Sequence, residues 1–257
     1  MSTAFTIVIP VYNDVELCRR ALDSVLRQDF DSFDIVVSDD STTDDIEEAI
    51  GLMGVQRVPV NYLHNRPSLG AVANWNRGMK EATGRYVIVM HHDEAMADTN
   101  YLKTVYAHLE KGADVAVSAI TVMENGTERK RRFTPTLVRF FLRHPSLLFL
   151  ANAIGPCACV AFRREQMQDF DTHLHWLVDV EWYYRMSRRR RVVYDPQLHI
   201  LSLHGHQGQI TGETDIPAMF RQDRTILRKK YQRPAVRLFL LLQQVLKYSS
   251  SHHRRHE

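Results

Sequence analysis

Short apolar runs alternate with amphipathic segments along the first half of the chain. The runs have the length of buried strands, and between them apolar residues recur at the three- to four-residue spacing of a helix. The predicted strands are residues 5–12, 33–37, 60–63, 86–90 and 115–122. The predicted helices are residues 15–27, 43–50, 71–82 and 99–111. This alternation predicts an α/β fold, with a mostly parallel sheet covered by helices on both faces.

The second half of the chain is less regular. Asn125 and Gly126 form a predicted hairpin turn, and the sequence His144-Pro145 separates two short apolar helices at 136–142 and 146–151. Three further strands are predicted at 157–162, 192–194 and 200–203. Three helices are predicted at 176–188, 215–231 and 234–248. We expect residues 249–257 to form a disordered tail.

Composition narrows the class of protein. The formal net charge of the 257 residues is only +3, which does not indicate a nucleic-acid partner. The three cysteines, Cys18, Cys157 and Cys159, form no CxxC pair and predict no disulfide framework. No apolar run reaches the roughly 18 to 20 residues that span a bilayer, and the N-terminus predicts a strand instead of a secretory signal. These features predict a cytoplasmic protein.

Polar residues cluster directly after the apolar run 86–90. They are His91, His92, Asp93 and Glu94. In an open α/β sheet, ligands bind at the carboxyl ends of the strands. Two carboxylates at such a point are suited to holding a divalent cation against a diphosphate. A GxGxxG sequence is absent after the first predicted strand, which disfavours an ordinary nicotinamide or flavin enzyme.

Five segments, in this order, resemble the family 2 glycosyltransferases, which have a GT-A fold. They are IVIPVYND, VVSDDSTTDD, NRPSLGAVANWNRGMKEATGRYVIVMHHDE, WLVDVEWYYR and LHGHQGQIT. The resemblance spans residues 7–206. It implies a GT-A domain over residues 1–212, with a nucleotide-sugar-binding half (1–122) and an acceptor-binding half (123–212). Residues 213–248 would then be C-terminal helices.

The activity that the resemblance implies is metal-dependent, inverting transfer of a hexose from a nucleotide diphosphate-sugar. UDP-sugars are the default donor. The implied acceptor is a hydroxyl of a glycan or a lipid-linked glycan, in the synthesis of bacterial surface polysaccharides.

The resemblance also assigns donor contacts to residues at the predicted strand ends and around the third helix. They are Pro10, Tyr12, Asp14, Asp39, Asp40, Arg66, Gly70, Asn74, Arg77 and Asp93. A carboxylate after the second strand can accept hydrogen bonds from a pyrimidine N–H or a ribose hydroxyl. From the residues alone, Asp39 and Asp40 are equally suited to capping the next helix. Asn74 and Arg77 share a helix face and could instead be packing or surface residues.

Asp93 and Glu94 occupy the position of the family's Asp-x-Asp metal motif, which implies Mn²⁺ or Mg²⁺ as the cofactor. Glu94 replaces the aspartate expected as the direct ligand, and its extra methylene moves the ion. The resemblance makes His204 a candidate third ligand. Considered alone, each of these histidines is more often a hydrogen-bonded structural residue than a ligand.

Asp179 matches the family's catalytic aspartate, although Val178 replaces the glutamate that usually precedes it. Inverting transfer needs one base to take the proton of the acceptor hydroxyl, and the resemblance gives this role to Asp179. Glu181 and Trp182 are predicted on the acceptor side, with Glu181 binding the acceptor or orienting Asp179. Without the other segments, Asp179 would be a carboxylate that stabilises a helix N-terminus.

Two apolar segments, residues 137–150 and 235–246, contain arginines. Both are too short to span a bilayer. They could lie on the inner face of the cell membrane near a lipid-linked acceptor. Core packing or a homodimer interface explains them equally well.

Two other functions remain open. One is a metal-dependent hydrolase that uses His91, His92, Asp93, His204 and His206. The other is a non-catalytic nucleotide-sugar-binding protein, which the departures at Val178 and Glu94 suggest.

Overall fold

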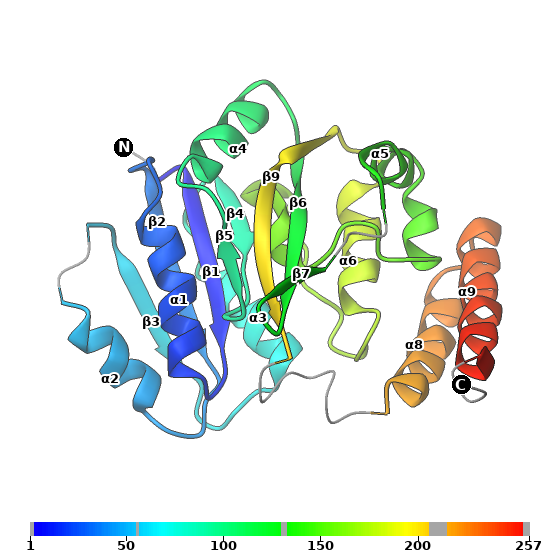
Figure 1. Ribbon diagram of the computed structural model, residues 1–257, viewed down its shortest axis with the longest axis horizontal. Helices are drawn as coiled ribbons and strands as arrows, with labels where there is room; N and C mark the ends of the chain where they lie inside the picture. The colour runs from blue at the N-terminus through cyan, green and yellow to red at the C-terminus, as the bar shows by residue number, and fades with distance from the viewer. Residues whose placement is uncertain (1–2, 55–56, 130–132, 206–214, 254–257) are drawn as a thin grey trace.

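The computed structural model in Figure 1 describes residues 3–54, 57–129, 133–205 and 215–253, with side chains described as far as Gln243 in the last helix. The first part contains β1 (Phe5–Val11), α1 (Val15–Leu26), β2 (Phe33–Asp39), α2 (Asp45–Leu52), β3 (Val60–His64), α3 (Ala71–Lys80) and β4 (Tyr86–Val89). The middle contains β5 (Glu94–Met96), α4 (Tyr101–Glu110), β6 (Val115–Glu124), β7 (Thr127–Arg129), α5 (Pro135–Arg143) and the 3-10 helix η1 (Pro145–Phe149). The last part contains η2 (Cys157–Cys159), β8 (Val160–Arg163), η3 (Arg164–Gln166), α6 (Val178–Ser187), β9 (Val192–His204), α8 (Ile216–Lys230) and α9 (Pro234–His253).

The strands of the described residues form one sheet in the order β3-β2-β1-β4-β8-β6-β9-β5, with β7 paired to β6. Strands β1 to β4 are parallel, and β6 is parallel to β9. Strand β8 runs antiparallel to both β4 and β6, and β5 runs antiparallel to β9. The predicted α/β fold with a mostly parallel sheet is therefore confirmed, with antiparallel strands inserted in its second half.

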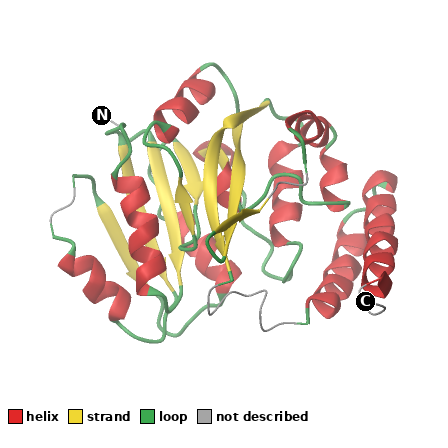
Figure 2. Ribbon diagram, in the orientation of Figure 1, coloured by secondary structure: helices red, strands yellow, loops and turns green. Residues whose placement is uncertain are grey.

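The chain reverses its direction across the sheet at β1. It moves from β1 to β2 and β3, and then returns to pair β4 with the other edge of β1. Because such crossovers are right-handed, this reversal puts α1 on one face and α3 on the other (Figure 2). A glycine lets α3 approach closely, since a Cβ at Gly78 would come within 2.5 Å of Val8. The carboxyl ends of β1, β2 and β4 meet at this reversal, where open α/β sheets bind ligands.

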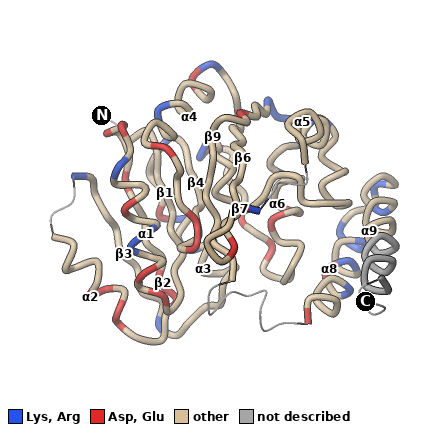
Figure 3. Tube along the Cα trace, viewed as in Figure 1, with Lys and Arg blue, Asp and Glu red and all other residues tan. Residues whose placement is uncertain are grey.

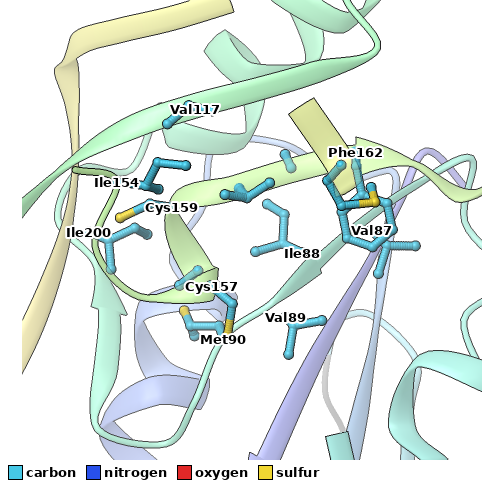
Figure 4. Packing of buried hydrophobic residues seen from close by; sticks show 14 of the residues in the cluster. Val87, Ile88, Val89, Met90, Val117, Ile154, Cys157, Cys159, Phe162 and Ile200 are labelled. Atoms are coloured by element: carbon cyan, nitrogen blue, oxygen red, sulfur yellow. The ribbon is translucent and has the colours of Figure 1, made fainter. Parts of the chain in front are cut away.

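The core lies on both sides of the central strands. All residues of β4 are fully buried, and Figure 4 shows Val87, Ile88 and Val89 among side chains from β6, β8, β9 and the 3-10 turn that carries Cys157. Burial of each such large apolar side chain contributes about 1.5 to 3 kcal/mol. On the α6 side, Trp182 stacks on Phe170 with ring centroids 4.6 Å apart.

Three element predictions were wrong. Residues 192–204 form one strand, where two were predicted because the segment around Pro196 interrupts the apolar pattern. A register shift at Ser118 and Ala119 of β6 lets the pairing continue past this segment. Glu94 begins a three-residue strand that was not predicted, because the residues before it are polar. Helix α9 continues to His253, so the predicted disorder from Ser249 is wrong over 249–253, and 254–257 lie outside the described residues. In the described part of the chain, no helix combines the length and apolarity needed to cross a membrane.

Candidate active site

Asp40 organises the segment that leads into α3. Its carboxylate is 2% exposed and accepts four hydrogen bonds: from Asn65 Nδ2 (3.0 Å), Ser68 Oγ (2.7 Å), Leu69 N (2.7 Å) and Gly70 N (2.8 Å). Gly70 has a φ of 83°, which glycine adopts at little cost, and it turns the chain into the helix. Asp40, directly after β2, therefore fixes the loop that leads into α3, and its acceptor sites are taken up by the protein itself.

Asp39 and Asn74 also make their hydrogen bonds within the fold. Asp39 is fully buried and accepts from Ser41 N at 2.8 Å and from the Tyr62 hydroxyl at 2.6 Å. The Asn74 amide accepts from Ser38 Oγ and Asn65 Nδ2 and donates to the Ser38 carbonyl. These residues, which we predicted as donor contacts, are buried and connect the end of β2 to α3 through their hydrogen bonds.

The other predicted donor residues lie nearer the surface. Asp14 caps α1 by accepting from Leu17 N at 2.9 Å, and Tyr12 beside it is 49% exposed. The carbonyl oxygen of Pro10 lies 3.3 Å from His92 Nδ1. Arg66 is exposed and pairs with Asp44.

Arg77 is exposed on α3, on the wall of a groove of about 510 Å³. The groove runs between α3 and the segment before α6. It is lined by Leu69, Ala73, Asn76, Arg77, Lys80, Glu81, Asp169 and Thr172.

A candidate metal centre lies where β4 ends and β5 begins. One ligand atom each from His91, Asp93 and Glu94 lies within 4.8 Å of the other two. Glu94 is 2% exposed and accepts from His91 N at 2.9 Å, while its Oε1 lies 3.3 Å from His91 Nδ1. Burial raises the pKa of Glu94 to about 7, and His91 opposes that rise. Two carboxylates and an imidazole at this spacing form a donor set suited to Mn²⁺ or Mg²⁺.

His91 lies between helix α3 and the 3-10 turn that carries Cys157. Its ring packs against Trp75 of α3 with centroids 4.4 Å apart, and its Nε2 lies 3.4 Å from Cys157 Sγ. Burial raises the pKa of Cys157 to about 12, so this side chain is a neutral thiol at physiological pH. Asn74, which precedes Trp75 in α3, belongs to the hydrogen-bond network around Asp40. Helix α3 therefore connects the end of β2 to the candidate metal centre.

Asp179, at the start of α6, interacts electrostatically with the same histidine. Burial raises the pKa of Asp179, and the charge of His91 opposes the rise. Both Asp179 and Glu94 act electrostatically on Cys157 and on Tyr183. The Oδ1 atom of Asp179 is buried without a hydrogen-bond partner among the described residues. A buried acceptor of this kind is costly, and such atoms concentrate at functional sites.

Two contacts fix the helix that carries Asp179. Asp223 of α8 is fully buried, and its carboxylate accepts from the backbone N atoms of His175, Trp176 and Leu177 at 2.7 to 3.1 Å. Glu181 binds Arg185 within α6 and Lys230 of α8. Helix α8 therefore holds the segment before α6 through Asp223 and forms an ion pair with α6 through Lys230.

Glu181 and Trp182, predicted on the acceptor side, make their hydrogen bonds within the fold. Glu181 is fully buried, and its carboxylate is used by Arg185, Lys230 and the Tyr231 hydroxyl. Trp182 is fully buried, with its Nε1 donating to the Gln168 carbonyl at 2.7 Å. Both side chains are therefore buried and hydrogen-bonded within the protein, and their predicted acceptor-side roles stay predictions.

Of the two histidines expected near the end of β9, only His204 lies within the described residues. His204 is the last residue of β9, paired in register with Glu124, and it is not a member of the ligand group around Asp93. His206 lies outside the described residues. The residues that sequence reasoning missed are Cys157 and Asp223. Asp223 and Cys157 gave no signal, because their importance comes from contacts 48 and 66 residues away in the chain.

Solved structures with the same fold define the class of this protein. The TarS 1–349 fragment of S. aureus in complex with UDP-GlcNAc superposes with a TM-score of 0.69 at 17% identity, covering 93% of this chain and 72% of that one. The mannosyltransferase PcManGT of Pyrobaculum calidifontis, in complex with GDP-Man and Mn²⁺, gives a TM-score of 0.68 at 17% identity, covering 96% and 70%. The fold is thus the GT-A fold that these neighbours share.

Sequence comparison gives the family. Residues 6–202 match the family described as glycosyl transferase family 2. The chain belongs to this family, and its activity is nucleotide-sugar-dependent glycosyl transfer. Among its relatives, protein MT1568 of Mycobacterium tuberculosis strain CDC 1551 is 29% identical over 88% of this chain and 73% of its own length. Glycosyltransferase GlyG of Streptococcus pneumoniae serotype 4 is 29% identical over 46% of this chain, and the aligned part spans only 39% of GlyG.

Proposed function

We propose that this protein transfers a hexose, with inversion, from a nucleotide diphosphate-sugar to a hydroxyl of a glycan or lipid-linked glycan in the synthesis of a bacterial surface polysaccharide. UDP-sugars are the default donor, and the TarS neighbour with bound UDP-GlcNAc supports this choice. The observation that carries the proposal is the carboxylate oxygen of Asp179, which is buried without a hydrogen-bond partner among the described residues, in a carboxylate that interacts electrostatically with His91 of the candidate metal centre.

Asp179 is the proposed base. It takes the proton of the acceptor hydroxyl while that oxygen bonds to the anomeric carbon from the face opposite the nucleotide. The bond between the anomeric carbon and the diphosphate oxygen breaks, and the nucleotide diphosphate leaves with the electron pair. The raised pKa of Asp179 favours proton acceptance, because a base works best when its pKa approaches the working pH.

Asp93 and Glu94, joined by His91, are the residues that would hold Mn²⁺ or Mg²⁺, and their mutual spacing fits such an ion. When bound, the cation supplies positive charge that stabilises the departing diphosphate. His204 remains a predicted additional ligand. The PcManGT neighbour, solved with Mn²⁺, supports a metal in this fold.

The proposed nucleotide site is the edge formed by the ends of β1 and β2. Tyr12, half exposed, offers a ring face to the base, and the Pro10 backbone and Asp14 extend the same wall. Asp39, Asp40 and Asn74 shape this edge from beneath through their internal hydrogen bonds. Gly70, Arg66 and Arg77 lie around the start and along the exposed side of α3, and the two arginines are the proposed cationic contacts.

A thermal-shift screen of nucleoside diphosphates, each with and without Mn²⁺, tests the donor and the metal together. A ligand at 100 times its dissociation constant stabilises the folded state by about 2.7 kcal/mol, which raises the melting temperature of a domain this size by about 5 to 10 °C. We expect the largest shift with UDP and Mn²⁺, and loss of the Mn²⁺-dependent part in Glu94→Gln. The proposal fails if no nucleotide shifts the melting temperature under either condition.

The same protein sample separates the alternatives. A hydrolase of the His91, His92 and Asp93 cluster would carry tightly bound zinc and respond to metal without a nucleotide. A non-catalytic binding protein would show the nucleotide shift, but neither transfer to an acceptor nor slow hydrolysis of the donor.

A further inference from the structure

Helices α8 and α9 enclose a hollow that the proposed reaction does not use. They lie beyond the residues matched by the family, which end at 202. The hollow measures about 240 Å³. It is lined by Arg221, Arg224, Thr225, Arg228, Leu240 and Leu241. Three guanidinium groups and two leucines around one small space form a site with a cationic and an apolar wall.

The charge around this hollow is strongly one-sided. Residues 216–243 contain seven basic residues and one acidic residue, although the whole chain has a net charge of only +3. Figure 3 shows these basic positions along α8 and at the start of α9. The single acid, Asp223, is fully buried and bound to the backbone before α6. Within the described part of the chain, Arg221 and Arg228 make no ion pair, so their charge is available to an anion.

The neighbouring face of α9 is apolar and exposed. Leu238, Leu241 and Leu242 are 51%, 50% and 39% exposed, and their spacing of three and four residues puts them on one side of the helix. Leu241 belongs both to this face and to the lining of the hollow. A free phosphate would need only the arginines, and the leucines beside them would remain in water. A lipid offers a phosphate to the first group and an acyl chain to the second.

We propose that the α8–α9 pair binds the surface of a membrane that contains anionic phospholipid. A lipid phosphate occupies the hollow between Arg221, Arg224 and Arg228, and the three leucines enter the boundary between headgroups and acyl chains. A second copy of the chain fits this surface poorly, because a symmetric pairing would bring two basic surfaces together. Membrane binding does not depend on the transfer reaction. If both occur, the docking helix is the one whose Asp223 holds the start of the helix carrying Asp179.

Vesicle co-sedimentation of the full chain tests the proposal. Two vesicle types are compared: phosphatidylcholine alone, and phosphatidylcholine with about one quarter phosphatidylglycerol, the anionic component that the arginines require. We expect sedimentation with the anionic vesicles only, weakened by added salt. The double variant Arg221→Gln, Arg228→Gln should partition at least tenfold less, since each cation near an anionic surface contributes about 1 kcal/mol. The variant Leu238→Gln, Leu241→Gln should also lose binding.

Matched substitutions on other helices provide the control. Arg27→Gln at the end of α1 and Leu52→Gln on α2, where the leucine is 85% exposed, should leave vesicle binding unchanged. All of these positions are exposed, so melting temperatures should stay within about 2 °C of the parent protein.

Three results would overturn the proposal. Equal binding to neutral vesicles would show that the arginines do not recognise a phosphate. A melting shift with inorganic phosphate, together with no vesicle binding, would show a site for soluble anions. A dimer in solution that the leucine variant dissolves, again without vesicle binding, would assign the face to a second copy.

Discussion

One aspartate is buried at the end of β2 and another at the start of α6, but the two differ in the hydrogen bonds that their carboxylates accept. At β2, Asp40 accepts four hydrogen bonds from the segment that leads into α3. At α6, Asp179 has a buried oxygen that accepts none from the described residues. Asp40 therefore stabilises a loop, whereas Asp179 keeps an unused acceptor beside His91 and the metal ligands.

This difference separates residues that shape the site from a residue placed to react. When a carboxylate whose acceptor sites are all occupied is removed, the free energy of unfolding of the protein falls. A buried carboxylate with an orphaned acceptor is itself destabilising, and that cost is retained where function requires it. Stability and activity should consequently respond in opposite ways to changes at Asp40 and Asp179.

The largest effect should come from Asp179→Asn. Loss of a general base lowers the transfer rate by about 10²- to 10⁴-fold. Folding stability should stay the same or rise slightly, since a buried ionisable group becomes neutral. Transfer assays and thermal melts on the same sample measure both quantities. Normal turnover in this variant would remove Asp179 from the base role, while a large drop in melting temperature would mean that it is structural.

Asp40→Ala should show the reverse pattern. It leaves two backbone N–H groups, a hydroxyl and an amide without their acceptor in the loop before α3, so we expect a loss of about 2 to 4 kcal/mol in the free energy of unfolding. Chemical denaturation measures this loss. Exposed Asp23 on α1 offers the control, since Asp23→Ala should change stability by less than about 0.5 kcal/mol. An Asp40→Ala protein with parental stability but no nucleotide-induced shift would make Asp40 a direct ligand.

Asp223→Asn should combine a smaller loss of stability with a selective loss of rate. The amide puts an NH₂ group near backbone donors before α6, which costs about 1 to 3 kcal/mol. Because Asp223 acts through the position of Asp179, we expect kcat to fall several-fold with the KM for the donor unchanged. Steady-state kinetics with varied donor concentration separates the two parameters. An increase in donor KM with unchanged kcat would contradict this positioning role.

The alternation of apolar and polar positions was enough to predict the α/β class and most elements of the first half. Strand β4 and the acidic cluster after it could be placed because consecutive apolar residues and turn-forming residues are local signals. The family resemblance then brought Asp93, Glu94 and Asp179 to one region, and shared electrostatic contacts with Cys157 agree with that arrangement.

Other features depend on contacts that local patterns do not contain. Nothing around Glu181 or Trp182 in the sequence indicates which side of α6 faces the core, so the complete burial of both residues could not be predicted. Asp223 lies in a basic helix, and only the fold reveals that it binds the segment before α6, 46 residues earlier. The continuous strand β9 was hidden by Pro196, which sequence patterns treat as a break.

The smallest effect concerns the ion pair that joins the segment before α6 to the end of α8. Burial alone would raise the pKa of Asp171, but the hydrogen bonds from Lys230 and the backbone of His173 lower the pKa to about 2. The unfolded chain has a higher pKa, near 3.9. The pair therefore stabilises the fold above about pH 4, and this contribution is lost as the pH falls towards 2. Solvent screening at the partly exposed Lys230 reduces the contribution to about 1 kcal/mol. Denaturation of Asp171→Asn should differ from the parent protein by this amount at pH 6 and by almost nothing at pH 2, and an equal difference at both pH values would exclude a role for the charge.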